Sequence, residues 1–298
     1  MKAFFKKYPA LIFFIGAAVL ITVIFVFYEV MYKRQNREQQ KNYEELNKNA
    51  WVTEFAADAS ENPAEETDPE IAENERKLQE FLEVEGNSDK YRKTIYSHPD
   101  FAEYLAINEE VVAYVLIPES KIDYPVLYNE TEQDYYLKRN IDGSTGYPGC
   151  IYIENLNAPN LSDPVTVLYG HNMGDGTMFG ALHDFFRKKG YLEEHPYIFV
   201  YQPGSVSVYE TVGYTTYTDK HVLAECFEKQ ENEEFVYQGM PEDMQTRVWK
   251  TLKDFGGSGN YFSEAEVGAE DKLLILSTCS SDRRRALVVA KLMFTHLY

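Results

Sequence analysis

The apolar residues of the 298-residue chain first gather in one uninterrupted run near the N-terminus. Residues 9–28 read PALIFFIGAAVLITVIFVFY and carry no charge. A helix of about 20 such residues, rising about 1.5 Å per residue, spans the roughly 30 Å apolar layer of a bilayer. A cleaved signal peptide is the alternative, but the run is long for one and no small-residue cleavage site follows it. The pattern favours an uncleaved membrane anchor over residues 1–32, whose orientation is left open by basic residues at both flanks.

Polar and acidic residues dominate the next stretch of the chain, residues 33–85. Residues 49–75 hold few large apolar side chains and two prolines, so they cannot bury enough apolar surface to offset the entropy of ordering. This composition predicts an acidic stalk or linker. Helical spacing of apolar residues returns over Ile71–Leu82, and a second short helix is expected over Tyr91–Leu105.

Short apolar runs separated by turn residues make up most of the remaining chain. Short helices are expected near Met178 and over Glu242–Lys253. Many short strands with few helices predict a mainly β domain, most simply a closed or nearly closed barrel. The domain is expected to cover residues 86–298, with helices at 86–105 and the barrel at 106–298. The predicted strands are Val111–Ile117, Ile151–Ile153, Val165–Tyr169, Tyr197–Tyr201, Val206–Thr218, Lys272–Cys279 and Ala286–Thr295.

Charge and cysteine content narrow the functional classes. The formal net charge is −19, and much of the acidity lies in the predicted linker, so a solvated acidic surface is its simplest explanation. Nucleic acid is disfavoured as a partner because phosphate recognition requires a clustered basic surface. The three cysteines, Cys150, Cys226 and Cys279, do not form the pattern of a disulfide framework. None has zinc-ligand spacing, so neither a metal nor another cofactor is expected, and Cys150 and Cys226 are expected to be packing residues.

Cys279 ends one apolar run, and a second apolar run begins at Arg285 after five intervening residues. The simplest arrangement is an antiparallel hairpin with a five-residue loop, in which Cys279 and Arg285 face each other. Directly opposed residues have Cβ atoms about 4.5–5.5 Å apart. A guanidinium at that distance favours a thiolate and can donate to an oxyanion during acyl transfer. The alternatives are a small buried cysteine and a solvated basic turn over residues 283–285.

Six histidines could supply a base for such a thiol, and His171 has the best position. It follows a predicted strand, and Gly170 lets the backbone turn sharply and expose the next side chain. A thiol, an arginine and a Gly-His pair at strand ends form an acyl-transfer constellation. Their order, His…Cys…Arg, differs from the Cys…His…Asn order of papain-like proteases. Surface or satisfied core roles are expected for the other histidines, His98, His183, His195, His221 and His296.

These motifs make the chain resemble a sortase, and specifically a class B sortase. LSTC at residues 276–279 matches the family's LxTC motif, and YGHN at 169–172 matches its histidine motif. The run from Arg285 to Lys291 matches its arginine strand. Residues 107–126 resemble the start of the sortase barrel, so the likeness covers the chain from about residue 105 onward.

Class B is indicated by the N-terminal helices and by a helix-bearing insertion at about residues 219–270, before the cysteine strand. The short loop between the cysteine and the arginine departs from some class B members. Class C enzymes carry a lid with an Asp-Pro-aromatic motif and often a second C-terminal membrane helix. Here Glu70 follows Asp68-Pro69 and the sequence stops at Tyr298, so class C is disfavoured.

The resemblance implies a cysteine transpeptidase with Cys279 as nucleophile, His171 as general acid and base, and Arg285 as the oxyanion and substrate-positioning group. Ser277 and Thr278 would line the groove for the sorting signal. Such an enzyme cleaves the C-terminal sorting signal of a secreted protein at a threonyl bond, through a thioacyl-enzyme. It then transfers the protein to an amine of the cell-wall precursor, lipid II or peptidoglycan. The implied location is the cell membrane of a Gram-positive bacterium, with one span and the catalytic domain outside.

Three alternatives stay open from the sequence. The same scaffold could serve a cysteine peptidase or hydrolase, with water as the acceptor, or a pilus-polymerising sortase. A membrane-tethered binding module would require no reactive thiol. Supplying an amine nucleophile separates a transferase from a hydrolase, and a thiol reagent separates either one from the binding module.

Overall fold

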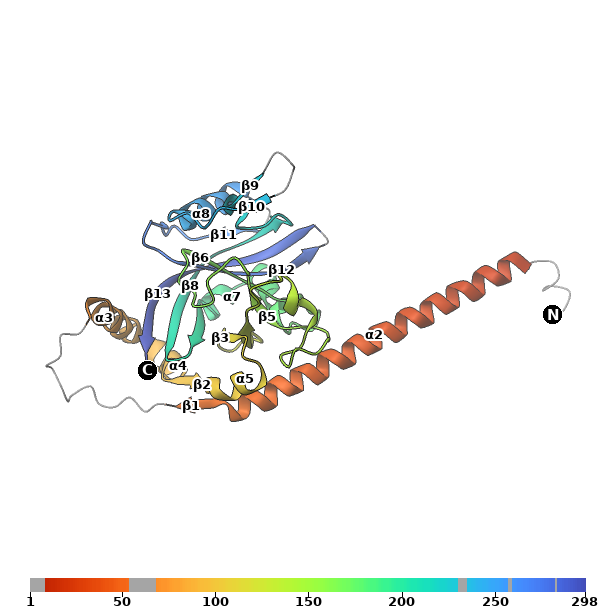
Figure 1. Cartoon of the computed structure of the whole chain (residues 1–298), viewed down its shortest axis with the longest axis horizontal. Helices are drawn as coiled ribbons and strands as arrows, with labels where there is room; N and C mark the ends of the chain where they lie inside the picture. The colour runs from red at the N-terminus through yellow and green to blue at the C-terminus, as the bar shows by residue number, and fades with distance from the viewer. Residues whose placement is uncertain (1–8, 54–67, 230–234, 257–258, 282) are drawn as a thin grey trace.

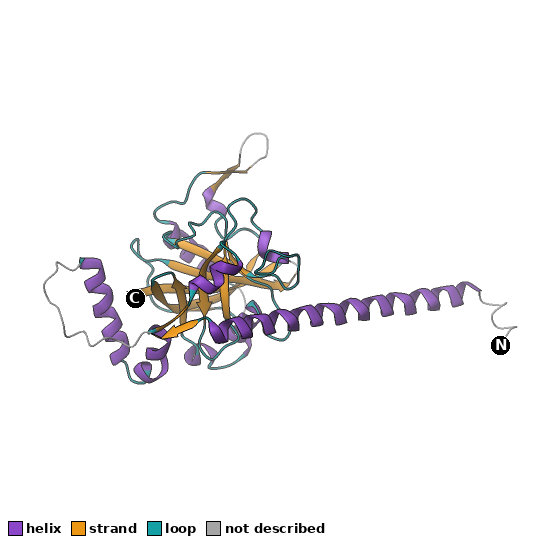
Figure 2. Cartoon of the chain, turned by 60° about the horizontal axis from the view of Figure 1, so that its bottom comes forward, coloured by secondary structure: helices purple, strands orange, loops and turns teal. Residues whose placement is uncertain are grey.

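The structure is a computed structural model that describes residues 9–53, 68–229, 235–256, 259–281 and 283–298. A β-barrel forms its centre, one long helix projects away from the barrel, and a smaller layer of helix and strands covers one side (Figure 1). Figure 2 shows the same arrangement with the strands gathered in the middle and the helices around them. The mainly β barrel predicted from the sequence is confirmed.

The barrel closes because the two ends of its sheet pair with each other. Its strands are β3 (Val111–Leu116), β4 (Asp123–Leu127), β5 (Ile151–Ile153), β6 (Val165–Tyr169), β7 (Tyr197–Gln202), β8 (Ser205–Thr218), β12 (Leu273–Ser281) and β13 (Arg284–Leu297). In the described residues these eight strands follow the order β8-β13-β12-β6-β5-β4-β3-β7, and β7 pairs again with β8. The β12–β6 and β4–β5 pairs are parallel, whereas the other pairs in this circuit are antiparallel.

All seven predicted strands are present, and the strand list missed β4. Its central residue is Pro125, which lacks a backbone N–H and argues against a strand in sequence reasoning. The shorter elements are β1 (Trp51–Thr53), β2 (Ser97–Pro99), η1 (Tyr135–Lys138), η2 (Phe179–His183), α6 (Asp184–Arg187), α7 (Tyr191–Glu194), η3 (Ala224–Cys226), β9 (Phe227–Lys229), β10 (Phe235–Tyr237) and β11 (Tyr261–Phe262). The helix expected near Met178 is therefore a 3-10 turn, η2, followed by a single α-helical turn, α6.

Alternate residues of β12 belong to two different apolar clusters, because successive side chains of a strand point to opposite faces. Leu274 and Leu276 belong to the larger cluster, which fills the barrel. Leu273 and Ile275 belong to a smaller cluster that also contains Trp249 and other residues of α8 (Met244–Phe255). The predicted helix over Glu242–Lys253 is thus confirmed as α8, and the insertion before the cysteine strand covers the outer face of β12.

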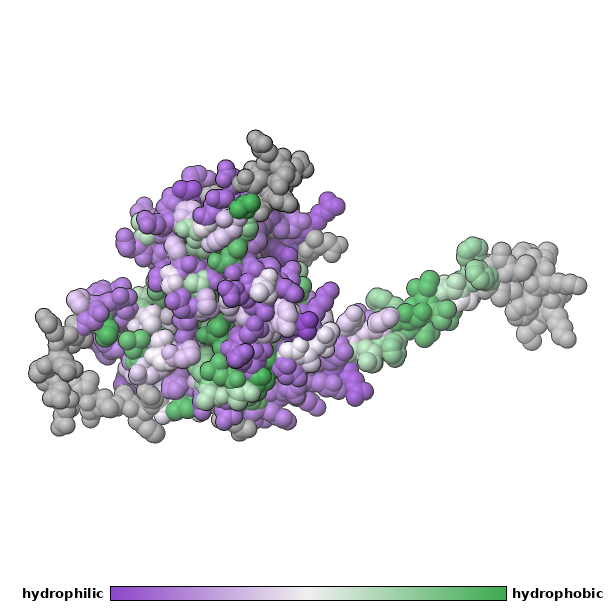
Figure 3. All heavy atoms as spheres, viewed as in Figure 1, coloured by the Kyte–Doolittle hydropathy of each residue, from purple (hydrophilic) through white to green (hydrophobic). Residues whose placement is uncertain are grey.

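Helix α2 runs without a break from Pro9 to Asn49, so the apolar segment and the start of the predicted linker form one rod. Its N-terminal half projects away from the barrel and shows a hydrophobic surface, whereas the surface of the domain is mostly hydrophilic (Figure 3). Among the described residues, α2 is the one helix long and apolar enough to cross a membrane. The apolar side chains in this half are exposed, as Phe13 (73%) and Phe25 (64%) illustrate.

The C-terminal half of α2 packs against the barrel, which differs from the linker expected over residues 33–85. Asn36 and Tyr43 lie two turns apart on α2, and Ala50 follows the last residue of the helix; the three are buried, at 3%, 3% and 0% exposure. The physical reason is that polar side chains on one face of the helix find hydrogen-bond partners in the barrel. The middle of the predicted linker, residues 54–67, lies outside the described residues.

Helix α3 (Pro69–Glu83) confirms the predicted helix over Ile71–Leu82 and packs on β13. Phe81 contacts the ring of Phe294, with ring centroids 5.4 Å apart. The single helix expected over Tyr91–Leu105 is wrong, since the chain forms α4 (Asn87–Ile95), β2 and α5 (Phe101–Ile107) instead. Pro99 explains the break, because a proline disfavours helical backbone at the residue before it.

Replacing Phe81 tests whether α3 belongs to the folded domain. Phe81 is 3% exposed, so we expect Phe81→Ala to lower the free energy of unfolding by about 3–5 kcal/mol. Ile71→Ala is the matched control, because Ile71 is 39% exposed on the same helix and its loss is expected to cost less than about 1 kcal/mol. Denaturant titration of the detergent-solubilised chain measures both, and equal values would contradict the packing of α3.

Candidate active site

Cys279 and Arg285 are direct cross-strand partners in the antiparallel pair β12–β13. The guanidinium Nη1 of Arg285 donates a hydrogen bond to the Sγ atom of Cys279 over 2.8 Å, and the cysteine side chain is exposed. The predicted opposition of the two residues is therefore confirmed. The predicted five-residue loop is too long, since the strands extend to Ser281 and Arg284 with a β-bulge after the cysteine.

Parallel pairing of β12 with β6 brings the Gly-His motif to the same edge as the thiol. The two strands point the same way, so their C-terminal ends coincide. The amide of Gly170 donates to the carbonyl of Ser277 over 3.2 Å, and the Thr278 hydroxyl donates to the carbonyl of Gly170 over 2.7 Å. A Cβ atom at position 170 would collide with the side chains of Ile151 and Phe179, so only glycine fits here.

The ring of His171 is half-buried, and a backbone carbonyl holds it on one side. Its Nε2 atom lies 2.8 Å from the carbonyl oxygen of Leu137. A carbonyl oxygen only accepts, so Nε2 carries a proton and Nδ1 is left to accept one. Burial lowers the pKa of His171, and the nearby Lys138 lowers it further, whereas the bond to Leu137 raises it. The ring is therefore a neutral base at pH 7, and its Nε2 hydrogen bond goes to Leu137 rather than to the thiol.

The structure adds two donors at the backbone of the cysteine. The Nδ2 atom of Asn172 donates to the carbonyl oxygen of Cys279 over 2.8 Å, and the Nε2 atom of His183 lies 3.1 Å from the same oxygen. Asn172 belongs to the histidine motif, but the sequence alone predicts no role for it. The sequence predicts only a surface or core role for His183, because nothing in it connects position 183 with position 279. These donors fix the peptide that bears the predicted nucleophile.

Ser277 and Thr278, the predicted groove residues, are both buried, at 1% and 2% exposure. The hydroxyl of Thr278 is engaged inside the domain by Gly170. Ser277 lies on the same face of β12 as Cys279, and its hydroxyl has no hydrogen-bond partner within the described residues. Contact of either side chain with a substrate stays a prediction.

The remaining thiols and histidines occupy structural positions. Cys150 and Cys226 are buried in the two apolar clusters, and burial raises the pKa of the Cys150 thiol to about 12. His221 pairs with the fully buried Glu154, a carboxylate that sequence reasoning did not single out. Within the described residues, no group of three or more His, Cys, Asp or Glu side chains could hold a metal ion.

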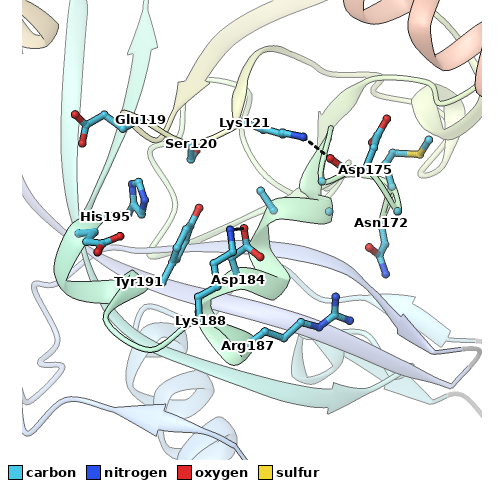
Figure 4. Close-up of a pocket in the computed structure, with 16 residues that line it drawn as sticks. Glu119, Ser120, Lys121, Asn172, Asp175, Asp184, Arg187, Lys188, Tyr191 and His195 are labelled. Carbon is cyan, nitrogen blue, oxygen red and sulfur yellow. Dashed lines mark hydrogen bonds and ion pairs between the residues drawn. The ribbon is translucent and has the colours of Figure 1, made fainter.

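A polar hollow of about 660 Å³ opens beside the histidine motif. Asn172 and Asp175 lie at one end of it, while Glu119 and His195 lie at the other (Figure 4). Both acidic and basic side chains line the hollow. Some of them form ion pairs, as Lys188 does with Asp184 at 2.8 Å. The cysteine thiol does not line this hollow, which adjoins the site only through the residues that follow the histidine.

Comparison with known proteins agrees with this geometry. The sortase domain model matches residues 115–293, which is more than half of the chain. Sortase B of Listeria monocytogenes is 30% identical over 59% of this chain and 65% of its own length, so the chain spans less than two thirds of that relative. Sortase B of Staphylococcus aureus is 27% identical over 72% of this chain and 85% of its own length.

A crystal structure of Staphylococcus aureus sortase B has the same fold, with a TM-score of 0.52 and 25% identity over 75% of this chain and 98% of that one. A sortase B–substrate complex from the same organism matches with a TM-score of 0.52 at 22% identity, over 74% of this chain and 94% of that one. The barrel, the paired cysteine and arginine, and these matches define the class of protein. The chain belongs to the sortase family, and the relatives it matches are class B sortases.

Titration of His171 tests its environment directly. Because burial disfavours the charged ring, we expect its pKa to lie below the ordinary value of 6.5. The rate of any reaction step that requires the neutral ring should then fall only as the pH drops below 6.5. Nuclear magnetic resonance of isotope-labelled histidine measures this pKa, with His171→Gln to assign the signal. A value at or above 6.5 would contradict the burial of the ring.

Proposed function

We propose that this sortase is a membrane-anchored transpeptidase that attaches secreted proteins to an amine of the cell-wall precursor. In the first step, the thiolate of Cys279 attacks a threonyl carbonyl in the C-terminal sorting signal of the substrate. The bond from that carbonyl carbon to the next nitrogen breaks, a thioester forms on the enzyme, and protonated His171 gives its proton to the leaving amine. In the second step, the acceptor amine attacks the thioester, loses a proton to the ring, and releases the thiolate.

The observation that carries this proposal is the 2.8 Å contact between the Arg285 guanidinium and an exposed thiol. The other two cysteines are buried, as structural cysteines are. A guanidinium at hydrogen-bond distance stabilises negative charge on sulfur and can then donate to the oxyanion of the tetrahedral intermediate. A solvated basic turn would not direct one arginine at the sulfur.

The neutral ring of His171 supports a role in proton transfer. Its lowered pKa leaves the ring as a base near neutral pH, and its tautomer leaves Nδ1 to accept a proton. In this proposal the ring takes the thiol proton and then returns it to the leaving amine. The imidazole and the thiol would come within hydrogen-bond reach when the substrate binds, since catalytic hydrogen bonds are often longer in apo structures than in reacting complexes.

The location of the enzyme follows from its long apolar helix and its substrates. We infer that residues 1–32 anchor the chain with a single span and that the catalytic domain, residues 86–298, lies outside the cell. Sorting-signal-bearing secreted proteins and a lipid II or peptidoglycan amine would meet the enzyme there. Residues 33–85 would connect the two parts, with the C-terminal half of α2 packed on the barrel rather than extended as a spacer.

Mass spectrometry of the full chain in detergent tests the reaction. The chain is incubated with sorting-signal peptides of the NPxTx and LPxTG types, with and without a short peptide amine. We expect an acyl adduct on Cys279 that passes to the amine, because the thioester is more readily attacked by an amine than by water. Cys279→Ala should give neither product. Hydrolysis without transfer would indicate a peptidase, and a thiol unreactive toward every peptide and toward iodoacetamide would indicate a binding module.

The role of Arg285 has a matched control two residues away. We expect Arg285→Ala to lower kcat by about a hundredfold to a thousandfold, as loss of one oxyanion donor does. Arg283→Ala should stay within about twofold of the parent, because Arg283 is an exposed member of the same basic run. Equal losses in the two variants would show that only the charge of the run matters. The measurement is the rate of peptide acylation.

A further inference from the structure

We propose that helix α2 is a working part of the catalytic centre, and that Tyr32 and Tyr147 are positioning residues for His171. The helix that carries the membrane anchor would thereby hold the imidazole in place, in addition to tethering the domain. The kinetic part of this proposal rests on the transpeptidase function proposed above. Its structural part depends only on contacts of the described residues.

A chain of three rings connects the helix to the imidazole. The ring of Tyr32 lies against the ring of Tyr147, with centroids 4.8 Å apart and planes at 59°. The ring of Tyr147 in turn lies against His171, with centroids 5.4 Å apart and planes at 48°. Both separations fall within the range of about 4.5–7 Å at which aromatic rings attract each other. Tyr147 therefore packs beside the imidazole at a tilt, and α2 supports Tyr147.

A second route joins α2 to the loop that directly follows the histidine motif. The Nδ2 atom of Asn36 donates to Oδ2 of Asp175 over 2.8 Å and reaches the hydroxyl of Thr177 at 3.3 Å. The hydroxyl of Tyr124 donates to Oε1 of Gln40 over 2.9 Å and accepts from the amide of Met178 over 2.9 Å. The loop after His171 is thus held by the helix at two successive turns.

Contacts farther along α2 prevent the helix from sliding or turning on the barrel. The hydroxyl of Tyr43 lies 3.4 Å from Sγ of Cys150, inside the core. The hydroxyl of Tyr104 donates to Oδ1 of Asn47 over 2.8 Å. The helix is therefore fixed over its last four turns, and the position of Tyr32 relative to His171 is set by this docking.

The same docking fixes the height of the site above the membrane. The apolar run ends at Tyr28, and Tyr32 follows one helical turn later, about 6 Å along the axis at about 1.5 Å per residue. His171 would then lie close to the level of the lipid headgroups. An acceptor amine carried on a lipid would reach the site there without leaving the bilayer.

Positioning of the imidazole matters because a hydrogen bond at one ring nitrogen does not by itself fix the tilt of the ring. Leu137 holds Nε2 by one hydrogen bond, which leaves the ring able to rotate about that contact. Packing of Tyr147 beside the ring restricts this rotation. A displacement of about 1 Å in a catalytic group can cost about a hundredfold in rate, so loss of this packing should lower kcat.

The test compares Tyr32→Ala, Tyr32→Phe and Val30→Ala in the full chain reconstituted in lipid nanodiscs. We expect Tyr32→Ala to lower kcat of peptide acylation about tenfold to a hundredfold, with KM within about twofold. Tyr32→Phe keeps the ring and should restore the rate to within about twofold of the parent. Val30→Ala is the matched control, because Val30 is 59% exposed two residues earlier on the same helix. Tyr32 itself is 47% exposed, so its replacement leaves the core intact.

A second readout is independent of the substrate. The ring resonances of His171, measured on isotope-labelled histidine, should move in Tyr32→Ala and in Tyr147→Ala and should stay in place in Val30→Ala. Unchanged resonances together with an unchanged kcat in Tyr32→Ala would overturn the proposal, as would an equal loss of kcat in Val30→Ala. If the parent chain acylates no peptide but its His171 resonances respond to Tyr32→Ala, the transpeptidase function fails while the positioning contact stands.

Discussion

The hydrogen-bonding of β12 on both of its edges is the constraint on which the site depends. Its antiparallel partner, β13, presents Arg285 opposite Cys279, and its parallel partner, β6, ends in the histidine motif at the same edge. His171 and Arg285 are more than a hundred residues apart in the sequence. The hydrogen-bonded pairings of β12 with β13 and β6 nevertheless bring both to the end of the strand that carries Cys279. A slip of one residue in either ladder would turn the cysteine to the other face of the sheet.

This register is secured by burial on both faces of β12. The inward residues fill the barrel, and the outward residues are covered by α8, so neither face tolerates a shifted set of side chains. Only the end of the strand departs from this pattern, where the thiol is exposed and the peptide is held by Asn172 and His183. A rigid strand with an accessible end gives a nucleophile a fixed position without burying it.

Helix α2 and the barrel form a continuous structure in the described residues. Helix α2 presents exposed apolar side chains along its N-terminal half and buried polar ones along its C-terminal half. In the proposed membrane-anchored enzyme, this helix would meet two different environments, lipid and protein, in succession. Placing the imidazole beside the point of transition would connect the chemistry with the membrane surface at which the proposed substrates arrive.

Several features were determined by local sequence alone. The apolar run, the seven listed strands, helix α8 and the opposition of Cys279 and Arg285 follow from hydrophobic periodicity and from the short distance between two strands. Other features depend on partners remote in the chain, and no local pattern reports them. The bond from His183 to the cysteine carbonyl, the carbonyl of Leu137 at the imidazole and the packing of α2 on the barrel are of this kind. The polar composition of residues 33–50 predicted a solvated linker, because a sequence gives the polarity of a side chain but not the partner that satisfies it. Tertiary structure decided this question by supplying hydrogen-bond partners in the barrel domain along one face of the helix.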